Sequence, residues 1–286
     1  MLLSMRTTFI ILSLFIALQA NSQNYIRTID NLDTWAGQLK YDYELLSRFD
    51  KYCRSNNLLN GSLAMIDARG ANSWDYTRAV DLNNDGLQDV VFDGPSGGEP
   101  NIVYFFIQTN SGFEQVFEVM QGISKVTWKD ELLSQVITSD WGCCASIHLT
   151  HTIYNVNYDN QNRPVFTKAF QSIEVRDELT KPKEYLSDPI RFTVNNQGYK
   201  LRLEPAINDT TEYHWLDITG NTFANLKAGT VGTALAEQTD ETGRIWWYVA
   251  INFDTNVQNC ILNTTDEFPT KVISWISSRY VTKNEE

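Results

Sequence analysis

An acidic loop runs directly into an apolar segment in Asp81-Leu82-Asn83-Asn84-Asp85-Gly86-Leu87-Gln88-Asp89-Val90-Val91-Phe92. Side-chain oxygens stand at loop positions 1, 3, 5 and 9 and a glycine at position 6, which is the spacing of a calcium loop. One ion would take oxygens from the side chains of Asp81, Asn83, Asp85 and Asp89 and from the carbonyl of Leu87. The sequence therefore predicts calcium as a cofactor.

The apolar segment after this loop distinguishes it from an EF-hand. Phe92 occupies loop position 12, where an EF-hand has glutamate. Because Val90, Val91 and Phe92 are β-branched or aromatic, they predict a strand and not an exiting helix. A bound ion would then stabilise the loop at the start of this strand. The alternative is a turn rich in Asp and Asn that holds no ion.

Residues 79–92 resemble the calcium-loop repeats of FG-GAP and VCBS type, which are found in secreted and surface β-propeller proteins. The sequence contains one good copy, whereas those propellers carry several. The resemblance therefore implies a structural calcium loop in an exported protein and not a complete propeller.

The N-terminus has the pattern of a secretory signal peptide. Arg6 is the one charge between Leu2 and Ala20, and the apolar run of residues 9–18 follows it. This run is short for a membrane-spanning helix, and no later segment is apolar enough to span a bilayer. We expect residues 1–22 to be removed and the protein to be periplasmic or extracellular, without stable membrane insertion. An uncleaved anchor is the alternative.

The composition limits the partners of the chain. A net charge of −12 makes nucleic acid and anionic lipid surfaces poor partners. Eight tryptophans and an aromatic content of 12% supply side chains that suit the core of a β-sheet.

Residues 23–185 are predicted to form a first domain made of a helix and an antiparallel sheet. The apolar residues of the helix fall on one face: Leu45, Leu46, Phe49, Tyr52 and Cys53. Asn56-Asn57 and Asn60-Gly61 are expected to end the helical pattern. Strands are predicted at residues 102–107, 113–120, 132–138 and 147–157.

Four cysteines in an exported chain suggest disulfides: Cys53, Cys143, Cys144 and Cys260. Three connectivities are possible, and a bridge between the adjacent Cys143 and Cys144 would be strained. We expect Cys53 to pair with Cys143 or Cys144.

Residues 190–286 contain four ordered motifs separated by glycine-containing turns. They are Leu201-Arg202-Leu203-Glu204-Pro205, Leu226-Lys227-Ala228-Gly229-Thr230-Val231, Trp246-Trp247-Tyr248-Val249 and Trp275-Ile276-Ser277-Ser278-Arg279-Tyr280. Short strands with such turns predict a small barrel. The motifs closely resemble the bacterial SH3-like domain, although Ser274 stands where that family usually has glycine. The predicted fold is thus mainly β, with a helix-plus-sheet domain followed by a small SH3-like β-barrel.

The SH3-like resemblance implies a binding module that recognises a cell-wall component, such as peptidoglycan, or an envelope protein. Aromatic rings suit this task because a flat ring covers an apolar face of a sugar or peptide. The candidate ligand-binding residues are Tyr213, Trp215, Trp246 and Tyr280. Strand tryptophans can instead belong to the core, and either Trp246 or Trp247 must point inward because adjacent strand residues face opposite ways.

Catalysis has weaker support in the sequence. His148 and His151 lie three residues apart in a strand-like segment, where they would face opposite sides and not share a zinc ion. A cell-wall hydrolase could use Cys144 with either histidine, but the spacing does not match the peptidases that carry SH3-like modules. We therefore predict an exported, non-catalytic binding protein, with a hydrolase or an envelope inhibitor of the immunity type as alternatives.

Overall fold

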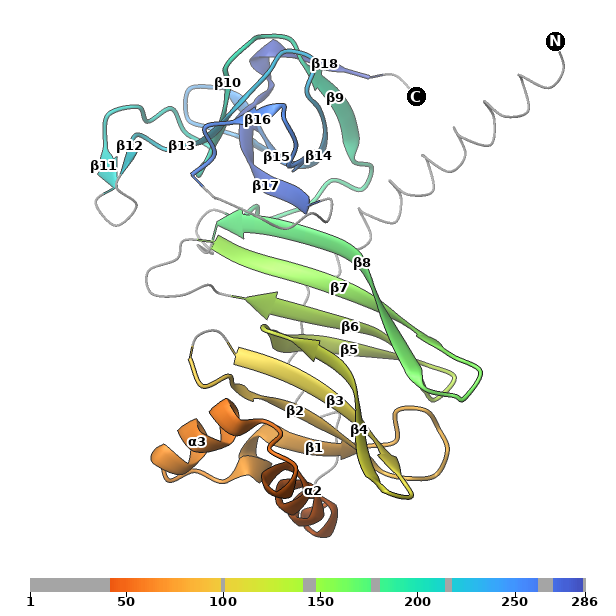
Figure 1. The fold of residues 1–286 in the computed structure, drawn as a ribbon. Helices are drawn as coiled ribbons and strands as arrows, with labels where there is room; N and C mark the ends of the chain where they lie inside the picture. The colour runs from red at the N-terminus through yellow and green to blue at the C-terminus, as the bar shows by residue number, and fades with distance from the viewer. Residues whose placement is uncertain are drawn as a thin grey trace, which may run out of the picture. The chain divides into compact units, whose positions relative to one another are not determined.

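The computed structural model describes residues 42–98, 101–140, 148–175, 181–213, 218–261 and 270–284. These residues are mainly β, with two α-helices and antiparallel sheets, which confirms the predicted fold class at this level (Figure 1). The chain divides into two compact units, one within residues 32–169 and one containing residues 170–286. The predicted signal peptide, residues 1–22, lies outside the described residues. In the described part of the chain, no helix combines the length and the hydropathy needed to cross a bilayer.

The N-terminal unit begins with helices and continues as two antiparallel groups of strands. Its first elements are α2 (Tyr43–Ser55), α3 (Asn60–Ala68), the short 3-10 helix η2 (Ser73–Tyr76), and the sheet β1-β2-β3-β4, with β1 (Thr77–Val80), β2 (Asp89–Pro95), β3 (Asn101–Thr109) and β4 (Gly112–Val119). The second group contains β5 (Gly122–Lys129), β6 (Leu132–Asp140) and β7 (His148–Tyr158), and β8 (Pro164–Val175) follows β7 after a short turn. The four strands predicted in this region correspond to β3, β4, β6 and β7.

Helix α2 forms where the apolar periodicity predicted it. Its N-cap is Asp42, whose carboxylate accepts a hydrogen bond of 3.0 Å from the backbone N–H of Leu45. Leu45, Leu46, Phe49 and Cys53 are buried, whereas Tyr52 is half-buried. The helix therefore begins at a side-chain cap and packs through the predicted face.

Helix α2 ends at Asn56-Asn57 as predicted, with Asn56 as its C-cap, but Asn60-Gly61 begins helix α3 where the sequence was expected to break the helical pattern. A Cβ atom at Gly61 would lie 2.8 Å from the carbonyl oxygen of Ser96 and would clash with it. Gly61 thus permits a close approach between α3 and the segment after β2. The glycine has a packing role, which periodicity alone does not reveal.

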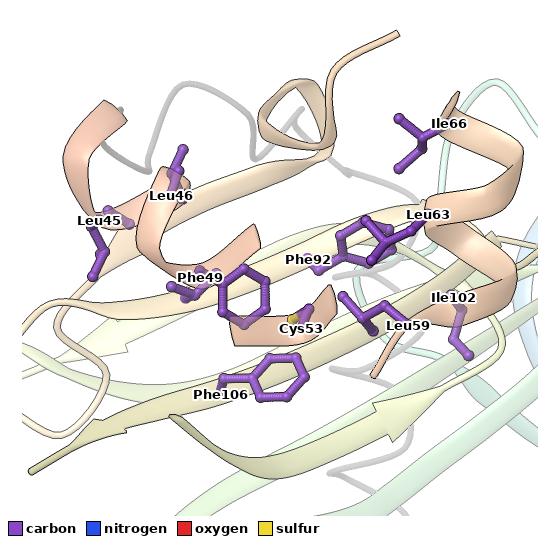
Figure 2. Packing of buried hydrophobic residues seen from close by; sticks show 12 residues of the cluster. Leu45, Leu46, Phe49, Cys53, Leu59, Leu63, Ile66, Phe92, Ile102 and Phe106 are labelled. Atoms are coloured by element: carbon purple, nitrogen blue, oxygen red, sulfur yellow. The ribbon is translucent and has the colours of Figure 1, made fainter. Parts of the chain in front are cut away.

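The sheet β1–β4 is apolar on both faces. Phe92 and Phe106 point toward the two helices, and Phe49 of α2 lies edge-on to Phe106 at 4.9 Å between ring centroids (Figure 2). Alternate residues of the same strands, such as Val91 and Phe105, join a second core with residues of β5 to β7. This burial on both faces explains the continuous apolar run in β3.

The C-terminal unit contains short strands joined by turns. They are β9 (Ile190–Val194), β10 (Tyr199–Arg202), β11 (Glu212–Tyr213), β12 (Ile218–Thr219), β13 (Thr222–Leu226), β14 (Val231–Thr239), β15 (Ile245–Asn252), β16 (Val257–Gln258), β17 (Thr270–Ser277) and β18 (Val281–Lys283), with the 3-10 helix η4 (Ser278–Tyr280) between the last two. Residues 171–174 of β8 also pair with β17, in parallel. All other strand pairings of this unit are antiparallel over the described residues.

The predicted closed barrel is not formed by the described strands. Pairing runs in the order β18-β9-β14-β15-β17, and β10, β13 and β16 continue from β17. In the sheet ladder, β10 pairs with β17 at Arg202 and Trp275, and with β13 over Tyr199–Arg202. Since no described pairing joins β16 to β18, the two ends of this order stay open.

Candidate functional site

A pocket of about 290 Å³ lies on the C-terminal unit and is lined by aromatic and basic side chains. Its lining residues are Gly198, Tyr199, Lys200, Arg202, Ile207, Arg244, Trp246, Ser277 and Tyr280. They come from β10 and the loop residues on either side of it, from Arg244 and Trp246 at the start of β15, and from the β17–η4 segment. The sheet brings these distant parts of the sequence together. This pocket is the candidate ligand site of the unit.

The aromatic residues of the pocket play different parts. Tyr280 is 53% exposed, and its ring lies edge-on to Tyr199 at 6.1 Å between centroids. The hydroxyl of Tyr199 donates a hydrogen bond of 2.6 Å to the carbonyl of Ser277, and burial raises the pKa of this phenol. Tyr280 therefore offers an accessible ring, whereas Tyr199 forms a fixed wall.

Trp246 lines the pocket although its side chain is fully buried. Its indole N–H donates a hydrogen bond of 2.8 Å to Asp240 Oδ2. Trp247 is buried as well, and its indole N–H donates to Glu237 Oε2 at 2.9 Å. The alternation of side chains along a strand required only one of the two tryptophans to be buried. Both are buried because β15 is a central strand between β14 and β17.

Of the other two candidate ligand residues, Tyr213 does not line this pocket. The Tyr213 hydroxyl donates a hydrogen bond of 2.9 Å to Glu204 Oε1, away from the lining residues. Trp215 lies outside the described residues. The structure thus brings together Trp246 and Tyr280 out of the four predicted residues.

The sequence did not identify the other lining residues, and the four that bear aromatic or basic groups are Tyr199, Lys200, Arg202 and Arg244. A signal for them existed, because basic residues next to aromatic ones are conspicuous in a chain of net charge −12. Their meeting in one place depends on the pairing of β10 and β15 with β17, which the motifs do not encode directly.

The carboxylates of the predicted calcium loop accept hydrogen bonds from backbone N–H groups of the loop and of the neighbouring strand β3. Asp81 accepts from the N–H groups of Asp85 at 3.2 Å and Gly86 at 2.9 Å. The carboxylate of Asp85 accepts from the N–H of Leu87 at 2.8 Å. The side chain of Asp89 accepts from the N–H groups of Leu82 at 2.8 Å and Gln108 at 2.7 Å. Each carboxylate oxygen retains a lone pair in these arrangements.

Two buried groups in the loop suit a cation. Asn83 is 5% exposed, and its Oδ1 has no hydrogen-bond donor, which is costly for a buried acceptor. Asp89 is fully buried, and burial raises its pKa to about 7, with smaller contributions from Asp85 and Asp81. A calcium ion would supply the missing partner to Asn83 and favour the charged form of Asp89.

No group of three or more His, Cys, Asp or Glu side chains within the described ranges is arranged to hold a metal ion. At the predicted loop, Asp81 and Asp85 direct their oxygens onto backbone N–H groups of the turn. The donor chemistry of the loop fits calcium, but the three carboxylates do not form a ready cluster.

His148 and His151 lie on β7 in different environments. His151 is buried, and its Nδ1 lies 2.8 Å from the hydroxyl oxygen of Ser139 on β6. His148 is half-buried, and burial lowers its pKa. Cys144, the proposed nucleophile of the hydrolase hypothesis, lies outside the described residues.

The expected disulfide of Cys53 is not formed in this structure. Cys53 is a free thiol at the centre of the helix core, with no exposed surface, and Figure 2 shows it among the apolar side chains. Burial raises the pKa of this thiol to about 12. The expected partners Cys143 and Cys144 lie outside the described residues. Cys53 thus packs as a small apolar residue.

Comparison with protein families, with curated proteins and with solved structures finds no match for this chain.

Proposed function

We propose that this protein is an exported, non-catalytic binding protein whose C-terminal unit recognises a cell-wall component. The observation that carries the proposal is the pocket that combines the exposed ring of Tyr280 with the walls formed by Tyr199 and Trp246. Such a concave site with a few placed polar groups suits a sugar–peptide ligand. The four ordered motifs that resemble the bacterial SH3-like domain support the same role.

The loop at residues 81–89 would have a structural part in this function. When bound there, calcium would take oxygens from Asp81, Asn83, Asp85, Asp89 and the carbonyl of Leu87, and it would neutralise the carboxylates of the loop. Loops of this kind outside the cell bind calcium at about 10⁻⁴–10⁻³ M, so the ion would be a constant part of the protein and not a signal.

The proposal is tested by co-sedimentation of the mature protein with purified peptidoglycan, with calcium and with a chelator. Wild type is expected to pellet, and Tyr280→Ala is expected to reduce pelleting. Tyr43→Ala is the matched control, because Tyr43 is 67% exposed on α2 and lies outside the pocket. Failure of the wild type to pellet in both conditions would favour an envelope protein as the partner.

A further inference from the structure

The candidate pocket is basic, although the chain as a whole is acidic. Lys200, Arg202 and Arg244 line it, and none of its lining residues is acidic. The net charge of the chain is −12. A concentration of positive charge in a concave site attracts a negatively charged group of a ligand.

Two of these three cations are already engaged. The Lys200 ammonium lies 3.0 Å and the Arg202 guanidinium 2.9 Å from the same oxygen, Oδ1 of Asp209. Arg202 also donates to Asn221 and has only 8% of its side chain exposed, so it serves the fold. The Lys200 side chain is 41% exposed and keeps donors for a further partner.

Arg244 is different, because its guanidinium forms no ion pair with any described residue. Its Nη1 makes a long hydrogen bond of 3.4 Å to the hydroxyl of Ser277, and its Cζ lies 5.8 Å from the ring centroid of Trp246. The Trp246 ring supports the cation without neutralising it. The planar guanidinium therefore keeps most of its donors for a ligand.

We propose that this pocket binds a free carboxylate of the ligand, with Arg244 as its principal partner and Lys200 as a second one. The group attached to the carboxylate then packs against the exposed side chains of Tyr280 and Ile207 at the rim. Arginine suits this task because its guanidinium can donate two parallel hydrogen bonds to one carboxylate. This inference rests on the proposed function, since it names the chemical group that the same pocket would bind.

A singly charged group fits the pocket better than a phosphate dianion. Asp209 stands beside Lys200 and Arg202, and its side chain is 45% exposed. Arg202 and then Lys200 hold the pKa of this carboxyl below its ordinary value, so it keeps its negative charge near the pocket. That charge opposes a second negative charge on the ligand.

The test is calorimetric binding of the mature protein to soluble muropeptides with free stem-peptide carboxylates and to the same muropeptides after amidation. Amidation and Arg244→Gln are each expected to weaken binding about 10- to 100-fold, as for loss of hydrogen bonds to a charged group. Arg244→Lys keeps the charge and is expected to recover part of this loss. Arg279→Gln is the matched control, because Arg279 is exposed in the same unit and does not line the pocket.

The outcomes separate this inference from the proposed function. Equal binding of free and amidated muropeptides, or equal losses for Arg244→Gln and Arg279→Gln, would overturn the carboxylate site and leave cell-wall recognition standing. Two small probes, N-acetyltyrosine and phenyl phosphate, compare a carboxylate with a phosphate on similar aromatic groups. If N-acetyltyrosine binds in an Arg244-dependent way but no muropeptide binds, the carboxylate site is supported. The cell wall is then rejected as the origin of the carboxylate ligand. Tighter binding of phenyl phosphate than of N-acetyltyrosine would overturn the choice of a carboxylate.

Discussion

The carboxylate of Asp89 accepts a hydrogen bond of 2.7 Å from the backbone N–H of Gln108, which lies on the neighbouring strand. Asp89 is the first residue of β2, and its other oxygen accepts from the N–H of Leu82 inside the loop. One fully buried side chain therefore joins the loop to the sheet. Any ion that binds Asp89 will act on the stability of this unit.

Calcium is expected to stabilise the protein, and Asp85→Ala is expected to abolish that effect. For a site with a dissociation constant of about 10⁻⁴–10⁻³ M, calcium at about 10 mM adds roughly 1–3 kcal/mol to the free energy of unfolding. Thermal melts with calcium and with a chelator measure this difference. Asp188→Ala, which removes an exposed carboxylate in the other unit, should keep the full calcium effect. Identical wild-type melts in both conditions would reject the calcium site.

The calcium effect is expected to grow as the pH rises through about 7. The pKa of Asp89 is raised by burial to about 7 in the folded protein, against about 3.9 when unfolded. Without calcium, this group contributes stability that is fully present below about pH 4 and is lost as the pH rises to about 7. Calcium needs the ionised form and compensates that loss. The melting temperature should therefore rise more with calcium at pH 8 than at pH 5.5, and equal rises at both values would contradict the assignment.

The thiol of Cys53 is expected to be unreactive in the native protein. It is fully buried in the helix core, and its pKa of about 12 leaves almost no thiolate at pH 8. Alkylation with iodoacetamide, followed by mass spectrometry of the Cys53 peptide, should show modification only after denaturation. Recovery of that peptide in a disulfide from a non-reduced digest would contradict the free thiol.

Lys181 is expected to stabilise the C-terminal unit through Glu174. The ammonium of Lys181 lies 3.0 Å from a carboxylate that is 2% exposed, and the hydroxyl of Tyr248 donates to the same carboxylate at 3.1 Å. Lys181→Met should cost about 1–3 kcal/mol, less than for a fully buried pair because Lys181 is 30% exposed.

Urea denaturation measures this cost, with Lys183→Met as the matched control. Lys183 is exposed and is expected to change stability by less than about 0.5 kcal/mol. Adding Glu174→Gln to Lys181→Met should restore part of the loss, since a neutral amide oxygen still accepts from Tyr248 without a buried charge. Equal stability of the two lysine variants would show that the ion pair contributes nothing.

Local sequence patterns predicted several of the helices and strands named above. The spacing of Leu45, Phe49 and Cys53 marked the buried face of α2, and the apolar run at residues 102–107 marked β3. These features depend on periodicity and on side chains that each element must bury, so a short window of sequence contains them. Asn60-Gly61 was misread because its glycine serves a contact with Ser96, which is distant in the sequence.

The sequence by itself determined the mainly-β class, the acidic loop ahead of β2 and the aromatic strands of the C-terminal unit, because each depends on residue type and near-neighbour spacing. Only the tertiary structure decided that Trp246 and Trp247 are both buried, that Cys53 is a free core thiol, and that the described strands stay open. It also decided that Arg244 and Tyr280 line one pocket. The physical reason is that strand pairing joins segments far apart in the chain, and no local pattern specifies which strand pairs with which.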